Sequence, residues 1–508
     1  MTATSTAPQP AAQAPESRLL RNRDFLTIWC GETVSLIGTQ VSGLALPLVA
    51  IVLLQATPLE IGALNASRYV PVVLISLFVG VWLDRRRRRP VLIAANVGRA
   101  LLVAAIPAAH ALGVLTIGLL CALCLLIGAL SVVFDIGLLS YFPSLVERHD
   151  LAEANGKIQA SASLTGIAGP GLGGFLIGLI GAATTLFVDA VSFLVSALML
   201  AFVRRPEPEP AKPAAGTSVR TSIAEGLRTV FGTRMLRSLL SQSATFNLLQ
   251  NALFTVFVVY AVRVLGLGTT QLGLVVGSMS FGAFVGSFVR RPLIAAVGLG
   301  QALRLVTWCT GLAPLLLIVP RDGELPAMAV LMTSHALLGC SLVVYNVTTV
   351  SLRQIVTPDR LLARMNASYR LVLFGTIPIG ALAGGTLASV AGLRTALIVT
   401  AIALVTPILW TFGAPVYALR TMPTGPDEDG TAAGHAPGRR TAGQHVRTGG
   451  RPPDGADRDR TDHGRPPGGR LHRLRPARHA QHVRPAHRTR RPHPAHHARR
   501  SGRGRHLT

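Results

Sequence analysis

The sequence predicts an all-α membrane protein with 12 transmembrane helices in two six-helix halves, followed by a disordered C-terminal tail. Three observations support this fold class. Half of the 508 residues are hydrophobic and only 14% are charged, whereas about 25% of residues are charged in ordinary soluble domains. The apolar residues form runs of about twenty residues, long enough to cross a hydrocarbon core. Clusters of arginine recur after every second run, as in loops on one side of a membrane.

The apolar runs are continuous and do not alternate with polar residues, so helices are favoured over the strands of a membrane barrel. The first 24 residues are polar, and the first run is too long for the apolar part of a signal peptide. We therefore expect this run to stay in the membrane. The predicted helices span residues 25–54, 61–83, 91–110, 113–139, 158–180, 183–203, 238–265, 271–289, 295–319, 327–350, 371–391 and 394–416.

The distribution of arginine predicts the orientation of these helices. The richest cluster, Arg85–Arg89, follows the second helix, whereas the turns after odd-numbered helices carry only Arg263, Arg321 and Arg394. Positive loops face the cytoplasm. Both termini are therefore expected in the cytoplasm, and the protein is expected in the inner (plasma) membrane.

An internal repeat divides the helices six and six. Residues 151–155, LAEAN, match residues 362–366, LARMN, at an offset of 211 residues. The same offset relates three glycines of the fifth helix to three of the eleventh: Gly169, Gly173 and Gly174 to Gly380, Gly384 and Gly385. The predicted organisation is a cytoplasmic N-terminal segment (1–24), a first half (25–203), a cytoplasmic linker (204–237), a second half (238–420) and a tail (421–508).

The linker and the tail have distinct compositions. Within the linker, residues 222–231 are expected to form a short amphipathic helix on the membrane surface. Residues 421–508 are rich in arginine, histidine, proline and glycine and have almost no large apolar residues. Such a segment cannot bury a core and is expected to be disordered. Two alternatives remain open. The tail binds nucleic acid, lipid or metal, or it is an out-of-frame extension of the gene.

The loop after the second helix carries a candidate gating motif. Gly80 is followed four residues later by Asp84 and then by arginines, among them Arg85, Arg88 and Arg89. This pattern resembles the signature of the major facilitator superfamily at the same loop, except that an arginine replaces the usual central glycine. The resemblance implies that Asp84 pairs with an arginine or a helix N-terminus and that this pair breaks as the halves rock. Alternatively, the arginines only fix topology and contact anionic lipid.

The fifth helix carries a second motif, formed by Gly156, Gly169, Pro170, Gly173 and Gly174. It resembles the helix-5 signature of drug/proton antiporters of the same superfamily, although a threonine replaces one glycine. Glycines four residues apart allow close helix packing, and a proline removes a backbone donor and bends the helix. The resemblance implies a seal against leakage, and packing alone is the alternative.

Five ionisable residues lie inside apolar runs: Glu32, Arg68, Arg99, Asp135 and Asp189. Charges in a bilayer are costly, so these residues are the candidate proton or substrate sites. Glu32 and Asp135 each lie about two helical turns from the cytoplasmic side. A carboxyl group shielded from water there could take up a proton. Salt bridges to Arg99 or Arg68 are the alternative role.

Residues Phe134-Asp135 and the segment 142–155 resemble a narrower group, the bacterial macrolide-efflux and enterobactin-exporter-like proteins. The resemblance covers about residues 18–416. It implies a secondary active transporter, with proton-coupled efflux of amphipathic small molecules (a drug, a macrolide or a siderophore-like compound) by alternating access.

Two other functions remain open: a uniporter or importer of a small metabolite, and a non-transport membrane protein. The sequence has no P-loop motif, so this chain alone is not an ATP-driven pump. No catalytic residue, metal site or cofactor is expected, and the protein is not expected to be an enzyme. The expected partners are a small-molecule substrate, protons and membrane lipid but no nucleic acid, and the protein is expected to be a monomer.

Overall fold

The computed structural model describes residues 18–83, 85–147, 150–205, 207, 219–320, 325–412 and 415–419. The regular secondary structure of these residues is entirely helical, which confirms the predicted fold class. The predicted disordered tail, residues 421–508, lies outside the described residues.

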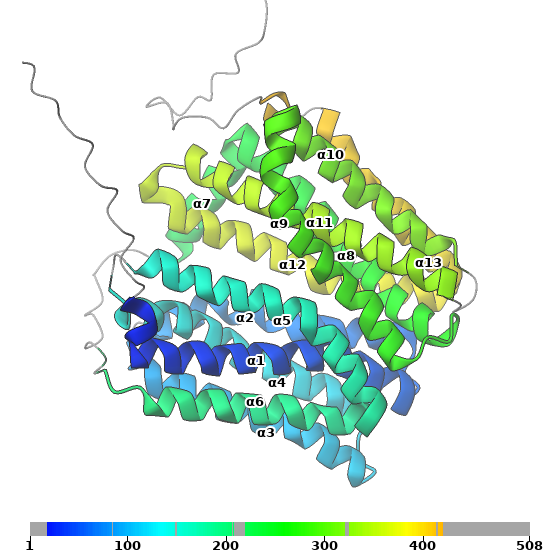
Figure 1. Ribbon diagram of the computed structural model, residues 1–508, viewed down its shortest axis with the longest axis horizontal. Helices are drawn as coiled ribbons and strands as arrows, with labels where there is room; N and C mark the ends of the chain where they lie inside the picture. Colours follow the sequence, from blue (N-terminus) through cyan, green and yellow to red (C-terminus); the bar gives the residue numbers. More distant parts are fainter. Residues whose placement is uncertain are drawn as a thin grey trace, which may run out of the picture. The chain divides into compact units, whose positions relative to one another are not determined.

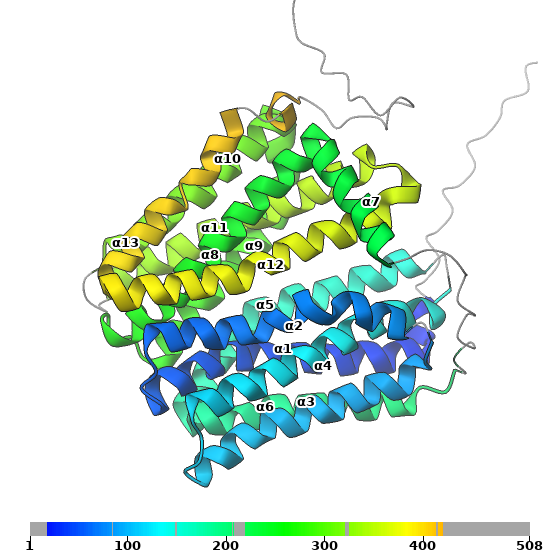
Figure 2. The same cartoon turned by 180° about the vertical axis from the view of Figure 1, so that it is seen from behind.

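Six long helices form the first half of the bundle, and they lie side by side (Figures 1 and 2). They are α1 (Arg23–Leu48, continued by a π-helical turn, Val49–Leu53), α2 (Pro58–Leu83), α3 (Arg88–Ala111), α4 (Ile117–Tyr141), α5 (Leu151–Ile180) and α6 (Ala182–Phe202). The second half contains α8 (Arg234–Arg263), α9 (Thr269–Val297), α10 (Leu299–Leu312, continued by a 3-10 helix, Ala313–Ile318), α11 (Leu325–Val356), α12 (Asp359–Ala391) and α13 (Leu393–Ala403, followed by a 3-10 helix, Thr406–Phe412).

Eleven of the described helices are long and apolar enough to cross a membrane. The twelfth helix of the bundle is α2, which has 26 residues and packs against both α4 and α12. Large apolar side chains such as Leu179, Phe288 and Val390 are exposed on the helices, as expected where a protein contacts lipid. The protein is a multi-pass membrane protein.

In the chain segment that links the two halves, α7 (Val219–Gly232) is the short helix expected there. It packs against α8 and α12. The carboxylate of Glu225 on α7 accepts a hydrogen bond from the guanidinium of Arg364 on α12 and forms an ion pair with it. The linker helix is therefore tied directly to a helix of the second half.

Two predicted helix starts lie more than four residues too late in the chain. The helix expected from residue 371 begins at Asp359, and the helix expected from residue 158 begins at Leu151. In both cases the first turns of the helix are polar or charged, a composition that is also typical of a loop. A membrane helix continues beyond the hydrocarbon core into the polar interface, so charge alone does not end it. The earlier start of α12 places Arg370 on a helix.

The two halves meet at two contacts related by the internal repeat. We call the end of the bundle at which α1 begins the proximal end and the opposite end the distal end. Near the distal end, α5 packs on α9 and α12 packs on α2. A Cβ atom at Gly174 would lie 2.7 Å from the Thr269 carbonyl oxygen, and one at Gly385 would lie 2.5 Å from the Pro58 carbonyl oxygen. Gly385 follows Gly174 by 211 residues, and Thr269 follows Pro58 by the same number. The internal repeat therefore relates the two contacts.

Gly273 on α9 offers a test of these contacts, because a Cβ atom there would lie 2.6 Å from the Pro170 carbonyl oxygen. Gly273→Leu is expected to force the halves apart at the distal end. Overpacking costs about 1–3 kcal/mol, enough to shift a conformational equilibrium about 5-fold to 150-fold. Labelling of a cysteine placed at Thr270 by a membrane-impermeant maleimide should therefore become faster.

Gly171→Leu on α5 is the matched control, because no atom lies within 4 Å of a Cβ atom at Gly171. Equal labelling rates in the two leucine variants would show that the glycine contact does not hold the distal end closed.

Candidate functional site

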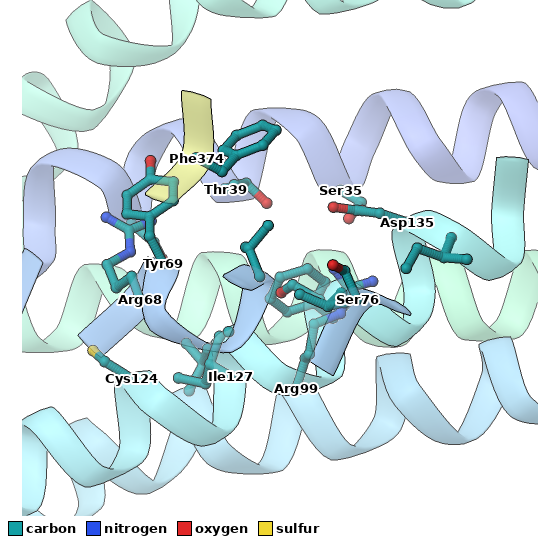
Figure 3. Close-up of a pocket in the computed structure, with 18 of the residues that line it drawn as sticks. Ser35, Thr39, Arg68, Tyr69, Ser76, Arg99, Cys124, Ile127, Asp135 and Phe374 are labelled. Carbon is teal, nitrogen blue, oxygen red and sulfur yellow. The ribbon is translucent and has the colours of Figure 1, made fainter. Parts of the chain in front are cut away.

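A cavity of about 510 Å³ opens among α1, α2, α3, α4, α6 and α12 (Figure 3). All five ionisable residues singled out in the sequence line it, although they come from five different helices. Arg370 of α12 is a sixth charged lining residue. The remaining lining includes the hydroxyl groups of Ser35, Thr39, Ser76 and Ser131 and the rings of Tyr69, Phe193 and Phe374. The cavity therefore combines an apolar and aromatic lining with three acids and three arginines.

Arg99 on α3 is held in place from several sides. Its side chain is buried, and its guanidinium donates a hydrogen bond to the Asn96 side chain. The guanidinium carbon lies 4.1 Å from the centre of the Phe134 ring and 4.3 Å from that of Phe193. Asn96 in turn donates to the Ser196 hydroxyl at 2.9 Å. These cation–π contacts and hydrogen bonds fix a permanent positive charge at one wall of the cavity.

Three carboxylates from different helices interact electrostatically with Arg99: Glu32 of α1, Asp135 of α4 and Asp189 of α6. Asp189 is buried and already paired, because the Ser42 and Ser192 hydroxyls donate to its two oxygens at 2.5 and 3.2 Å. The sequence interpretation missed both serines, since serine is ordinary in membrane helices.

The other two carboxylates have spare hydrogen-bonding capacity. One oxygen of Glu32 is buried and has no hydrogen-bond partner. Asp135 lines the cavity, and none of the described residues donates a hydrogen bond to it. With this spare capacity, Glu32 and Asp135 can hold protons or a cationic group.

Arg68 and Tyr69 of α2 and Arg370 and Phe374 of α12 also line the cavity. In Figure 3, Arg68, Tyr69 and Phe374 lie at one end of the view, and Ser35 and Asp135 at the other. Sequence reasoning missed Arg370 because it was placed just before the predicted helix. The Pro-Asp pair at 358–359 is the signal that could have found it, since proline and an acid are common where a helix begins.

The loop motif after α2 lies away from the cavity, at the proximal end. Gly80 is followed by the exposed Arg85, while Asp84 lies outside the described residues. The backbone amides of Arg88 and Arg89 donate to the Glu207 carboxylate at 2.5 and 3.2 Å. The linker thus caps the N-terminus of α3 with an acid that the sequence interpretation had not singled out.

The side chain of Arg89 ties α3 to α6. Its guanidinium donates to the carbonyl oxygens of Leu200 and Ala201 at 3.0 and 2.6 Å. An arginine at the C-terminal end of a helix satisfies carbonyls that have no partner within the helix. The side chain of Arg89 therefore contacts the first half, whereas the backbone amides of Arg88 and Arg89 contact the linker.

The motif of α5 lies where this helix meets α1 and α9. A Cβ atom at Gly169 would contact Gln40, and one at Gly173 would lie 3.2 Å from the Val41 Cα atom, both on α1. Pro170 and Gly174 face α9 through the contact described above. The fifth motif position, Gly156, has no atom within 4 Å of an added Cβ atom, so close packing gives it no role in this conformation.

Comparison with known proteins identifies the family. The model of the family described as transmembrane secretion effector matches residues 14–430. The chain belongs to this family of the major facilitator superfamily. The resemblance to that superfamily inferred from the sequence is thereby confirmed.

The similar curated proteins include transporters named for drug efflux. The multidrug efflux pump Tap of Mycobacterium tuberculosis is 26% identical over 380 residues, which cover 72% of this chain and 86% of Tap. Tap of Mycolicibacterium fortuitum is 27% identical over 356 residues, 67% of this chain and 82% of that protein. The uncharacterised transporter YfiS of Bacillus subtilis is 27% identical over 219 residues, 42% of this chain and 51% of YfiS.

Solved transporter structures share the fold. A bacterial homologue of the iron transporter ferroportin, in its inward-facing state, superimposes with a TM-score of 0.63 at 17% identity, covering 78% of this chain and 98% of that one. The nucleoside transporter NupG superimposes with a TM-score of 0.60 at 14% identity, covering 77% of this chain and 99% of that one. The family and the Tap relatives support a transporter of small molecules, and the solved structures show its fold.

Proposed function

We propose that the protein is a proton-coupled exporter of amphipathic small molecules in the plasma membrane. The single observation that carries this proposal is the cavity, in which Glu32 and Asp135 face the space that a substrate would occupy. Each carboxylate can hold either a proton or a cationic group of the substrate, but not both at once. Such competition at one site is the physical basis of exchange between protons and substrate. The names of the Tap relatives support efflux as the direction.

The contacts between the halves fit a state open at the proximal end. Among the described residues, three hydrogen bonds connect the first half to the second. All three lie in the distal part of the bundle. The guanidinium of Arg263 donates to the Ala56 carbonyl at 2.8 Å, and the Asn65 amide donates to the Thr255 hydroxyl at 3.2 Å. The third, from the Thr270 hydroxyl to the Gly174 carbonyl, measures 3.4 Å.

In this proposal the proximal end is cytoplasmic, because it carries most of the arginines. The carboxylates then lose their protons to the cytoplasm and bind the substrate. The halves rock to close the proximal end, the distal glycine contacts open, and external protons displace the substrate. The protein acts as a monomer, contacts anionic lipid through its proximal arginines and has no catalytic residue, so it is a carrier and not an enzyme.

Expression in a bacterial host that lacks its own efflux pumps tests the direction. Cells that produce the protein should accumulate several-fold less rhodamine 123, a cationic amphipathic dye, than cells that carry an empty vector. An ionophore that collapses the proton gradient should remove the difference. Greater accumulation in the producing cells would indicate import, and a difference that survives the ionophore would contradict proton coupling.

A further inference from the structure

Six charged residues line the cavity. Two of them are held by hydrogen bonds or cation–π contacts with several other side chains, and four are not. Asp189 accepts hydrogen bonds from two serines, and Arg99 is held by Asn96 and two aromatic rings. The remaining four are two acids, Glu32 and Asp135, and two arginines, Arg68 and Arg370. None of the described residues hydrogen-bonds or forms an ion pair with the guanidinium of either arginine.

Arg370 is the charged lining residue that the second half contributes within the described part of the chain. It is exposed to the cavity, and its guanidinium carbon lies 5.5 Å from the centre of the Phe374 ring, one helical turn further along α12. It interacts electrostatically with Asp135 of the first half but makes no ion pair with it. Its guanidinium therefore lies at the wall of the cavity, next to an aromatic ring.

Protons can neutralise the two acids, but arginine stays charged at every physiological pH. A substrate that is only cationic would take the place of the protons and leave Arg68 and Arg370 without an anion in a largely apolar cavity, which is unfavourable. A substrate with one cationic and one acidic group leaves the three acids and three arginines in balance. Arginine also binds a carboxylate through two parallel hydrogen bonds.

We propose that the transported molecule carries an acidic group in addition to its cationic one, and that Arg370 binds the acidic group while Phe374 packs against the adjoining apolar part. This inference rests on the proposed function and names its substrate class: amphipathic zwitterions. Arg370 is then a specificity-determining residue, supplied by the half opposite to the proton-carrying acids. Substrate binding therefore involves both halves.

Two dyes that differ by one methyl ester test the inference. Rhodamine 110 has a free carboxylate and is a zwitterion near neutral pH, and rhodamine 123 is its methyl ester and a cation. Binding to purified full-length protein is measured by fluorescence anisotropy. The wild type should bind rhodamine 110 about tenfold more tightly, as expected for one hydrogen-bonded charge. Arg370→Gln should remove this preference by weakening the binding of rhodamine 110 without weakening that of rhodamine 123, and Arg370→Lys should keep part of the preference.

Arg394→Gln, which removes an exposed arginine of α13 outside the cavity, is the matched control and should bind both dyes as the wild type does. Equal binding of the two dyes by the wild type, binding of neither, or an equal loss for both dyes in Arg370→Gln would overturn the inference. Recovery of both dyes when Asp135→Arg is added to Arg370→Asp would instead make Arg370 a counter-ion of Asp135. Dye binding is measured without a proton gradient, so it does not depend on export. If the protein prefers rhodamine 110 but shows no proton-driven export, the proposed function is refuted and the inference about the substrate class stands.

Discussion

Simultaneous replacement of Glu32 by Gln and Asp135 by Asn is expected to reduce proton-driven export about 100-fold or more. Both side chains keep their size and polarity but can no longer exchange a proton for a cationic group. A hydrogen bond to a charged group contributes about 1.5–3 kcal/mol, so losing two such contacts accounts for this factor. Protein yield and folding should remain close to those of the wild type, because neither carboxylate accepts a hydrogen bond from the described residues.

Proteoliposomes with an imposed pH gradient are the system in which to measure this loss. Glu153→Gln is the matched control, because Glu153 is an exposed acid of α5 whose one ion pair among the described residues is with Lys157 on the same helix, at 3.5 Å. Such surface pairs contribute little, so this variant should transport normally. Proton-driven export at the wild-type rate in the double variant would remove Glu32 and Asp135 from the mechanism.

Arg99→Leu is expected to have the largest effect on stability. It leaves Glu32, Asp135 and Asp189 without the cation that all three face, and it also removes the contacts with Phe134. Breaking a buried charge cluster in this way costs about 3–5 kcal/mol. The loss should be smaller in mildly acidic buffer, because protonation neutralises the acids that Arg99 no longer balances.

Unfolding of the detergent-solubilised protein, followed at two pH values, measures this loss. Arg68→Leu is the comparison, since Arg68 lines the same cavity but makes no hydrogen bond with the described residues. It should destabilise the protein far less. Equal losses in the two variants, or a loss in Arg99→Leu that does not change with pH, would show that Arg99 does not hold the three acids together.

The sequence alone predicts the helical membrane fold and most of the charged residues in the cavity. Charge inside an apolar run is rare enough to single out residues such as Asp135 and Asp189. The hydrogen-bond partners of these residues cannot be predicted in the same way. Ser42 and Ser192 belong to the most ordinary residues of a membrane helix, and their hydrogen bonds to Asp189 depend on how α1 and α6 pack. Arg370 escapes prediction because the charged residues before it resemble a loop, although α12 already begins at Asp359.

The contacts between the halves show the same limit. The repeat of Gly173 and Gly384 is visible in the sequence, and close packing at both positions follows from their spacing. Which helix each glycine meets is set by packing between segments far apart in the chain, and no pattern within one helix encodes it. Gly62 and Gly273, which lie on the partner helices, share the offset of 211 residues and became meaningful only in the structure.

The release of protons on substrate binding tests the central claim most directly. Purified protein in weakly buffered detergent solution is mixed with rhodamine 110 or rhodamine 123, and a pH indicator follows the bulk solution. The account predicts that the wild type releases protons when the dye binds and that the double variant Glu32→Gln, Asp135→Asn releases none. Binding of either dye by the wild type without proton release would contradict exchange of protons for substrate at these two carboxylates.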